Sequence, residues 1–244
     1  MTLWYEGPLA AFDTETTGVD VERDRILSAA VVVQPHITSP PRCTSWLVSP
    51  DVEIPAAATA IHGLTLPHLQ RLGRWPAPVM EEVGKALAAQ CASHVPLVVM
   101  NAPYDLTLLD RELGRHRASS LPKYLGGAPL CVLDPLVLDR HLDRYRKGRR
   151  TLSALCEHYG VELAGAHEAG ADATAALRLV RAIGQRYAER LGELSAAELH
   201  ARQAVWHGAQ ARGLTAWFAH TGSDERCDPA WPLRMSGLTT AARA

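Results

Sequence analysis

The 244-residue sequence lacks the features that would place it at a membrane or in a secretory pathway. No apolar run approaches membrane-spanning length, and the N-terminus has no basic segment followed by an apolar run. Internal repeats and low-complexity segments are also missing. We therefore expect a globular protein with no membrane partner and no signal peptide.

Paired cysteines and an excess of charge of one sign are missing as well. The five cysteines are dispersed and include no C-x-x-C pair, which predicts reduced thiols in a cytoplasmic protein. The formal net charge at pH 7 is −1, so the whole molecule is not a polycation. Any binding of nucleic acid must then come from a local basic patch.

Hydrophobic residues are abundant, at 47% of the chain, and support a sizeable core. Only two of them are phenylalanine, so this core is mainly aliphatic. Apolar periodicity predicts an opening strand meander followed by alternating helices and strands, which is typical of an α/β domain with a mixed sheet. The expected strands are 9–12, 26–33, 43–48, 97–100 and 130–133, and the expected helices are 56–61, 77–91, 103–113, 136–142, 152–159, 171–187 and one that starts at Ser195.

Two carboxylates, Asp13 and Glu15, stand at the end of the first predicted strand. Positions two apart in a strand point to the same side, so the two side chains converge. Ionised carboxylates that lie close together repel each other unless they share a proton or a cation. A hard divalent cation such as Mg²⁺ would remove this conflict. The alternative interpretation is a polar strand end that runs into a Thr/Gly turn.

Three further residues complete a chemical set. Asp105 follows a strand in the first turn of a predicted helix, and Gly170 places His167 in the loop before the helix that carries Asp172. Taken singly, each is an ordinary helix-start acid or a surface histidine. Together, four carboxylates are enough to hold two divalent ions for phosphoryl transfer, and histidine is a suitable base to activate water.

The motifs Asp13-Thr-Glu-Thr-Thr-Gly, Asn101-Ala-Pro-Tyr-Asp105 and His167-Glu-Ala-Gly-Ala-Asp172 resemble, in order and spacing, those of the DnaQ-like 3′–5′ exonucleases of the DEDDh type. The segment Ile61-His62-Gly63-Leu64-Thr65 is similar to the one that lies against the 3′-terminal nucleotide in that family. The resemblance covers residues 8–190. Two departures are Met100, where a histidine is frequent, and Tyr104, where phenylalanine is common.

The resemblance implies a ribonuclease-H-like fold, with a five-stranded mixed sheet flanked by helices, and 3′–5′ exonuclease activity that depends on two Mg²⁺ or Mn²⁺ ions. Asp13 would bridge both ions, Glu15 and Asp172 would complete the site that activates water, Asp105 would serve the second ion, and His167 would be the general base. The residues expected to contact the substrate are Thr16, Thr17, His62, Gly63, Leu64, Asn101 and Tyr104.

A basic run lies between the second and third motifs. It is either a solvated loop or a track for the phosphates of a single strand, and we favour the track because the expected substrate is a polyanion. Its members are Arg140, Arg144, Arg146, Lys147, Arg149 and Arg150.

The sequence predicts an exonuclease domain at 1–192 and, at 193–244, a helical extension that ends in a loose tail. We expect hydrolysis of single-stranded DNA from its 3′ end, in proofreading or repair. An RNA-trimming or oligoribonuclease-like enzyme is the alternative, because no motif reads a 2′-hydroxyl. A non-catalytic nucleic-acid-binding module would fit the fold, but all five candidate catalytic residues are present. Segment 195–220 either docks a polymerase or another protein, or has a structural role.

Overall fold

A computed structural model of the chain describes residues 3–234. Among these residues, five strands form one mixed sheet with the order β3-β2-β1-β4-β5. Its strands are β1 (Leu9–Thr16), β2 (Ile26–Gln34), β3 (Arg42–Leu47), β4 (Leu97–Val98) and β5 (Val132–Leu133).

The first three strands form an antiparallel meander, and β4 and β5 then add in parallel to β1. β2 is almost wholly apolar and β-branched, which suits a central strand. The β1–β2 ladder continues past the apolar part of β1, with Asp13 opposite Ala30 and Glu15 opposite Ser28. The two carboxylates therefore lie inside β1 rather than at or beyond its end, which corrects the boundary expected from the sequence.

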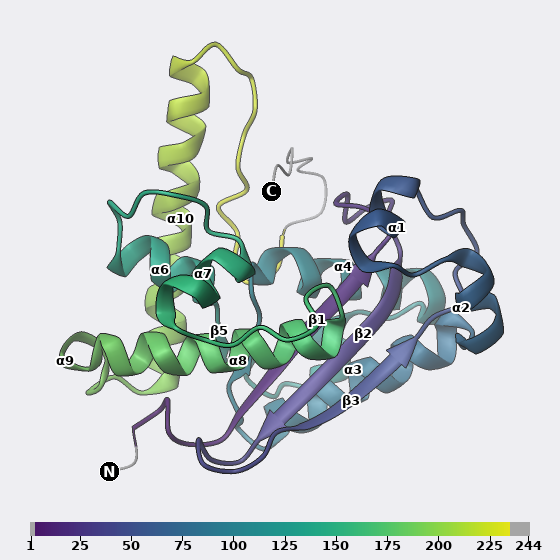
Figure 1. Cartoon of the computed structure of the whole chain (residues 1–244), viewed down its shortest axis with the longest axis horizontal. Helices are drawn as coiled ribbons and strands as arrows, with labels where there is room; N and C mark the ends of the chain where they lie inside the picture. The colour runs from purple at the N-terminus through teal and green to yellow at the C-terminus, as the bar shows by residue number, and fades with distance from the viewer. Residues whose placement is uncertain (1–2, 235–244) are drawn as a thin grey trace.

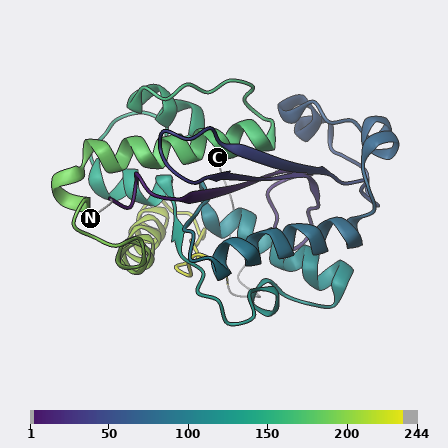
Figure 2. The same cartoon turned by 90° about the horizontal axis from the view of Figure 1, so that it is seen from below.

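Helices cover both faces of this sheet (Figures 1 and 2). They are α1 (Ala56–His62), α2 (Leu66–Leu72), α3 (Pro76–Ala92), α4 (Ala102–Arg117), α5 (Leu121–Leu125), α6 (Pro135–Leu142), α7 (Leu152–Tyr159), α8 (Ala169–Arg186), α9 (Ala188–Leu191) and α10 (Ala196–His220).

Two apolar clusters lie on opposite faces of the sheet. On one face, α3 and α4 pack around Phe12 and Leu106. On the other face, α8 lies along β1 and β2 and contributes Leu179 and Ile183 to a second cluster. Figure 2 shows these layers edge-on, with the sheet between α8 and the pair α3 and α4. The predicted α/β class with a mixed five-stranded sheet and flanking helices is confirmed.

Most predicted elements are present with small shifts at their ends. β4 and β5 have two residues each, so Met100 and Leu130 lie outside the strands where they were expected. The helix expected from Ala171 begins at Ala169, which places Gly170 in its first turn. A Cβ on Gly170 would lie 3.0 Å from Sγ of Cys43, so glycine lets this turn approach β3 closely.

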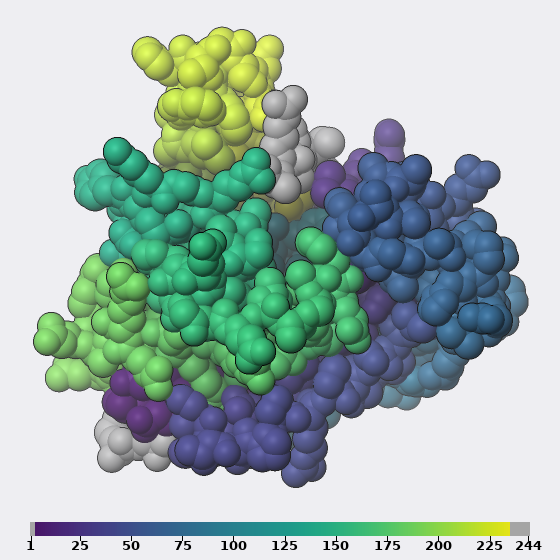
Figure 3. Space-filling view, viewed as in Figure 1, coloured from purple at the N-terminus to yellow at the C-terminus, as the bar shows by residue number. Residues whose placement is uncertain are grey.

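The C-terminal segment begins with α10. A capping box formed by Ser195 and Glu198 fixes the start of this helix, as the sequence predicts. Near its start, the helix lies against the end of the sheet. His200 accepts a hydrogen bond from the Val132 N–H through Nδ1 (3.0 Å), and Gln203 donates to the Val132 carbonyl (3.1 Å) and accepts from the Asp134 N–H (2.8 Å). The far part of α10 stands out from the body (Figure 3).

The loose tail expected after α10 is only partly correct. Residues 221–234 contain no helix or strand, but they return along α10 to the body (Figure 1). Trp231 and Leu233 pack against the cluster under α4, and the Arg234 N–H donates to Thr107 Oγ1 (2.9 Å). Apolar side chains therefore fix this segment, and the prediction of a loose tail is wrong for it. The remainder of the expected tail, 235–244, lies outside the described residues.

The five cysteines, all of which are described, form no disulfide. None of the helices within residues 3–234 combines the length and the apolarity that crossing a bilayer requires.

Candidate active site

Three of the predicted catalytic carboxylates meet beside β1. Each of Asp13, Glu15 and Asp172 offers an oxygen atom, and these oxygens lie within 4.8 Å of one another. Asp13 and Glu15 come from the same side of β1, while Asp172 comes from the first turn of α8. The carboxylates of β1 and α8 thus converge, as the sequence predicts from the two-residue spacing on the strand and from the helix start.

The crowding of these acids opposes their ionisation. Burial raises the pKa of Asp13 well above its usual value, and the nearby charges of Asp105, Asp172 and Glu15 add to the effect. Burial, together with the charges of Asp172 and Asp105, raises the pKa of Glu15 to about 7. Burial also raises the pKa of Asp172, although the His167 backbone N–H acts in the opposite direction. Without a cation, the cluster therefore retains protons that isolated carboxyl groups would lose.

Asp105 lies beside this cluster, in the first turn of α4, and it is almost fully buried. Thr14 Oγ1 donates to its Oδ1 at 2.6 Å. Burial raises the pKa of Asp105 to about 7, with the Thr14 hydrogen bond acting against this shift. Thr14 was not expected in the site. The sequence could have indicated it only by its position between Asp13 and Glu15, which directs its side chain to the opposite side of β1.

His167 lies in the exposed loop before α8, as predicted, with a positive φ of 68°. Its backbone N–H donates to Asp172 Oδ2 at 3.3 Å, which ties the loop to the acid cluster. Burial lowers the pKa of His62, and the charge of His167 contributes to the same shift, so the two imidazoles lie near enough to interact electrostatically. The structure thus brings the histidine of the third motif next to the segment of α1.

The residues predicted to hold the terminal nucleotide border the acids. Gly63 ends α1 with φ of 72°, and this left-handed turn lets the Leu64 N–H donate to His62 Nδ1 at 3.0 Å. Thr16 is the last residue of β1, and Thr17 Oγ1 donates to Asp24 Oδ1 at 2.6 Å. These side chains surround the end of β1, which points toward α1 in Figure 1.

The donor set fits a hard divalent cation. Carboxylate oxygens are the ligands that Mg²⁺ and Mn²⁺ prefer, and a bound cation would remove the repulsion that raises the pKa values. Asp172 Oδ1 is buried and accepts no hydrogen bond among the described residues. Such an oxygen is available as a ligand. The residues that would hold metal are Asp13, Glu15 and Asp172, with Asp105 beside them.

A family model described as "Exonuclease" (RNase_T) matches residues 10–180, which include all three motifs. This chain belongs to that exonuclease family. The sequence-based prediction of a DnaQ-like exonuclease is confirmed at this level.

Several relatives of this exonuclease are named as polymerase subunits. The DNA polymerase III subunit epsilon of Rickettsia prowazekii (strain Madrid E) is 26% identical over 166 residues, which are 68% of each chain. A "DNA polymerase III subunit epsilon-like protein" of Rhodobacter capsulatus is 38% identical over 106 residues, covering 41% of this chain and 14% of that protein.

Solved structures of exonuclease I share the fold. The E. coli enzyme in a complex with single-stranded DNA aligns with a TM-score of 0.65 and 18% identity over 76% of this chain. Exonuclease I of Methylocaldum szegediense aligns with a TM-score of 0.64 and 20% identity over 83% of this chain. This chain covers only 42% and 45% of those two proteins.

Tyr104, where phenylalanine is common in such exonucleases, adds a polar link to the site. Its hydroxyl lies 2.7 Å from Thr16 Oγ1 and donates to the Gly18 carbonyl, to which Thr16 also donates at 2.7 Å. The Tyr104 hydroxyl thereby fixes the turn that follows Glu15. This contact goes beyond what the sequence indicated for the position.

We expect Tyr104→Phe to raise KM for an oligonucleotide about 3- to 10-fold with little change in kcat, because one hydrogen bond that orients Thr16 is lost. Steady-state kinetics of the variant measure both constants. Tyr145→Phe is the matched control, since that side chain is 87% exposed. A lower kcat at unchanged KM would show that Tyr104 serves the chemical step instead.

Asp134 is a positioning residue that the sequence reasoning missed. It is fully buried after β5, and its carboxylate accepts from the backbone N–H groups of Asn101 (3.1 Å), Ala102 (3.0 Å) and Leu136 (2.9 Å). Asn101 has a left-handed backbone at the start of α4. Asp134 thus holds the second motif in place, and its sequence signal was Asp-Pro directly after a strand.

The basic run divides into two groups. Arg146 and Arg150 turn inward to Asp139, which is fully buried, while Arg144, Lys147 and Arg149 are exposed. Arg149 and Arg150 also line a cleft with Asn101 and Arg140. Arg146 and Arg150 are therefore engaged inside the protein, and the exposed members Arg140, Arg144, Lys147 and Arg149 are left as candidates for a phosphate track. Binding of phosphate by these residues stays a prediction.

We expect Arg150→Gln to lower the free energy of unfolding by about 2–3 kcal/mol, because Asp139 would lose an ion pair inside the protein and Arg146 compensates only partly. Urea denaturation measures this change. Arg144→Gln, a change at an exposed position, should shift stability by less than about 0.5 kcal/mol. Equal stability of the two variants would contradict a structural role for Arg150.

Proposed function

We propose that this exonuclease removes nucleotides from the 3′ end of single-stranded DNA by a two-metal mechanism with His167 as general base. The observation that carries the proposal is the convergence of Asp13, Glu15 and Asp172, with Asp105 beside them, next to a loop histidine. Family membership supports the reaction class.

In this mechanism, Asp13, Glu15 and Asp172, with Asp105 beside them, would hold divalent ions, which would stabilise the negative charge on the attacking and the leaving oxygens. His167 accepts a proton from water as the water oxygen forms a bond to the terminal phosphorus. The bond from phosphorus to the 3′ oxygen of the preceding nucleotide breaks, and that oxygen gains a proton. The products are a nucleoside 5′-monophosphate and a strand with a new 3′-hydroxyl.

The terminal nucleotide would lie between the His62–Leu64 segment and the end of β1. Gly63 leaves open space there, since a Cβ at this position would meet no atom within 4 Å. Thr16 and Thr17 would contact the sugar or phosphate from the other side. Asn101 and Tyr104, at the start of α4, would face the preceding nucleotide.

The preference for DNA rests on the relatives. A solved exonuclease I of this fold is in complex with single-stranded DNA, and the epsilon relatives are named as subunits of a DNA polymerase. A role in proofreading or repair follows from the same names. An RNA-trimming enzyme stays the alternative, since none of the site residues selects against a 2′-hydroxyl.

We also propose that residues 1–192 are the catalytic domain and 193–244 an appended extension. The family match ends at residue 180, before α10 begins. The far part of α10 exposes Leu214 and Trp217, which supports docking of a polymerase or another protein. In contrast, Trp206 stacks on His141 of α6 at 3.8 Å, which supports a structural role for the near part.

The test is a degradation assay with 5′-labelled single-stranded DNA and, separately, RNA, each with Mg²⁺, Mn²⁺ or EDTA. A descending ladder that requires metal would support the 3′–5′ exonuclease, and the faster polymer would identify the substrate class. No ladder on either polymer with either metal would overturn the proposal.

A further inference from the structure

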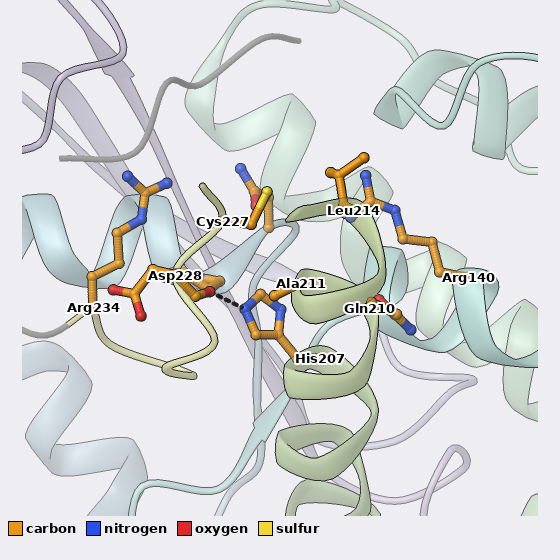
Figure 4. A pocket seen from close by; sticks show the side chains of 10 residues that line it. Arg140, His207, Gln210, Ala211, Leu214, Cys227, Asp228 and Arg234 are labelled. Carbon is orange, nitrogen blue, oxygen red and sulfur yellow. Dashed lines mark hydrogen bonds between the residues drawn. The ribbon is translucent and has the colours of Figure 1, made fainter. Parts of the chain in front are cut away.

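A second pocket lies beside the second motif, where the C-terminal segment meets the catalytic body. Its wall includes Asn101 and Pro103 from the start of α4, Arg140 from α6, His207 from α10 and Arg234 from the returning segment (Figure 4). Segments that are far apart in the sequence thus build one cavity, and the extension supplies a large part of it.

The charged side chains that line this pocket are Arg140, Arg234 and Asp228, and His207 lies beside them with a pKa that burial lowers. The Arg140 side chain forms no hydrogen bond or ion pair with another residue among 3–234 and is therefore available to a ligand. His207 Nε2 lies 3.2 Å from the Asp228 carbonyl, which leaves the other ring nitrogen for a further partner. The carboxylate of Asp228 accepts from the Ala230 N–H at 2.8 Å and so holds the returning segment.

The pocket borders a neighbouring cleft at the second motif. Asn101 and Arg140 also line the neighbouring cleft with Arg149 and Thr151, so the two hollows share one border. Asn101 precedes α4, whose first turn carries Asp105. A strand whose 3′ end lies at the acids could pass Asn101 and enter this region with its upstream nucleotides.

The size and chemistry of the pocket favour a phosphate group. Its volume of about 130 Å³ is smaller than the roughly 300 Å³ from which sites for drug-sized ligands begin, so a whole nucleotide does not fit. Guanidinium groups bind phosphate oxygens in a two-pronged geometry and remain charged at neutral pH. Two arginines and one aspartate leave an excess of one positive charge around the small cavity, which matches a phosphodiester that bears one negative charge.

We propose that Arg140, Arg234 and His207 form a subsite for a backbone phosphate of the single strand upstream of the scissile bond. The C-terminal segment thereby takes part in substrate binding and is more than a structural appendage. The inference rests on the proposed exonuclease function, because that function brings a single strand to Asn101. The subsite recognises phosphate and so serves DNA and RNA alike.

The first test measures binding without catalysis. In an Asp13→Asn background, fluorescence anisotropy with a labelled dT12 strand gives Kd over a range of salt concentrations, with a U12 strand as the RNA arm. Arg140→Gln and Arg234→Gln should each weaken binding of both strands about 10-fold at low salt. The slope of log K against log salt should fall by about 0.7 for each lost phosphate contact.

Two further variants make the result specific. Arg202→Gln removes an exposed arginine of α10 that lines neither pocket, and it should leave Kd and the slope unchanged. Arg140→Lys keeps a charge and should restore most of the slope even where Arg140→Gln disturbs folding. An unchanged slope in both Gln variants, or an equal loss in Arg202→Gln, would overturn the subsite.

The second test separates the subsite from the active site. Thymidine 5′-monophosphate p-nitrophenyl ester has no upstream phosphate, so the Arg140 and Arg234 variants should hydrolyse it at the wild-type rate while KM for dT12 rises. If the wild type hydrolyses neither substrate, the proposed function fails. The salt dependence of binding by the Arg140 and Arg234 variants still shows whether the pocket binds phosphate. A loss of ester hydrolysis equal to the loss on dT12 would contradict an upstream role.

Discussion

Replacing Asp13 with asparagine should abolish metal-dependent degradation, with kcat falling by at least about 10³-fold, while the metal-free protein becomes more stable. The loss follows from the central place of Asp13 among the oxygens that would hold metal. The gain follows because Asp13 is buried against Asp105, Asp172 and Glu15, and each charge opposes the others. Replacing this buried carboxyl group with a neutral amide should therefore raise the free energy of unfolding of the metal-free protein at pH 8.

The measurements are single-turnover degradation of a labelled strand and thermal unfolding in EDTA. Asp224→Asn is the control, because that carboxylate is exposed and distant from the cluster, and it should change neither quantity. Adding Mg²⁺ should raise the Tm of the wild type and have little effect on Asp13→Asn. A metal-free variant that is less stable than the wild type would show that repulsion is not the dominant force in the cluster.

The same repulsion gives the metal-free protein a defined pH dependence. Glu15 has a pKa of about 7 in the folded protein, above its usual 4.5, so the folded state binds more protons than the unfolded state between these values. The stability due to this group is complete below about pH 4.5 and disappears as the pH rises through about 7. Urea denaturation across this pH window should show that the free energy of unfolding of the wild type falls as the pH rises. The free energy of unfolding of Glu15→Gln should fall less.

Replacing His167 with alanine should lower kcat by about 10²- to 10⁴-fold, the usual contribution of a general base. The side chain is exposed and its backbone N–H to Asp172 is retained in the variant, so the fold and metal binding should persist. The expected signature is a loss of rate with little change in KM or in metal affinity.

Kinetics at several pH values and binding of Mn²⁺ by calorimetry test this separation. Added imidazole should restore part of the rate, since it can take the proton that His167 takes. His220→Ala removes another exposed histidine, at the end of α10, and should leave the rate unchanged. Full activity of His167→Ala would remove this residue from the mechanism.

The convergence of Asp13, Glu15 and Asp172 could be predicted from the sequence because the signals for it are local. Asp13 and Glu15 share a side of a strand through their spacing, and Gly170 places His167 and Asp172 around a helix start, so three short motifs define most of the site. The family match covers the segment that carries all three motifs. The roles of the individual residues in binding and catalysis remain the predictions tested above.

The parts that could not be predicted depend on contacts between distant segments. In the sequence, Asp134 indicates only the end of a strand. The fold shows that its carboxylate accepts hydrogen bonds from the backbone of Asn101 and Ala102 in the second motif. In the sequence, Arg146 and Arg150 belong to a basic run that is typical of a surface. In the fold, both form ion pairs with the buried Asp139 of α6. The segment after α10 is polar in composition, and its return to α4 depends on Trp231 and Leu233, two apolar residues within it.

The contacts of α10 with β5 have a consequence for the aggregation of the protein. β5 is an outer strand of the sheet, and such a strand can pair with a strand of another molecule through its free backbone groups. His200 and Gln203 instead bond to the N–H and the carbonyl of Val132, so side chains of a helix occupy the positions that a further strand would take. A fragment that ends at residue 192 would uncover this edge, and we expect it to self-associate through strand pairing.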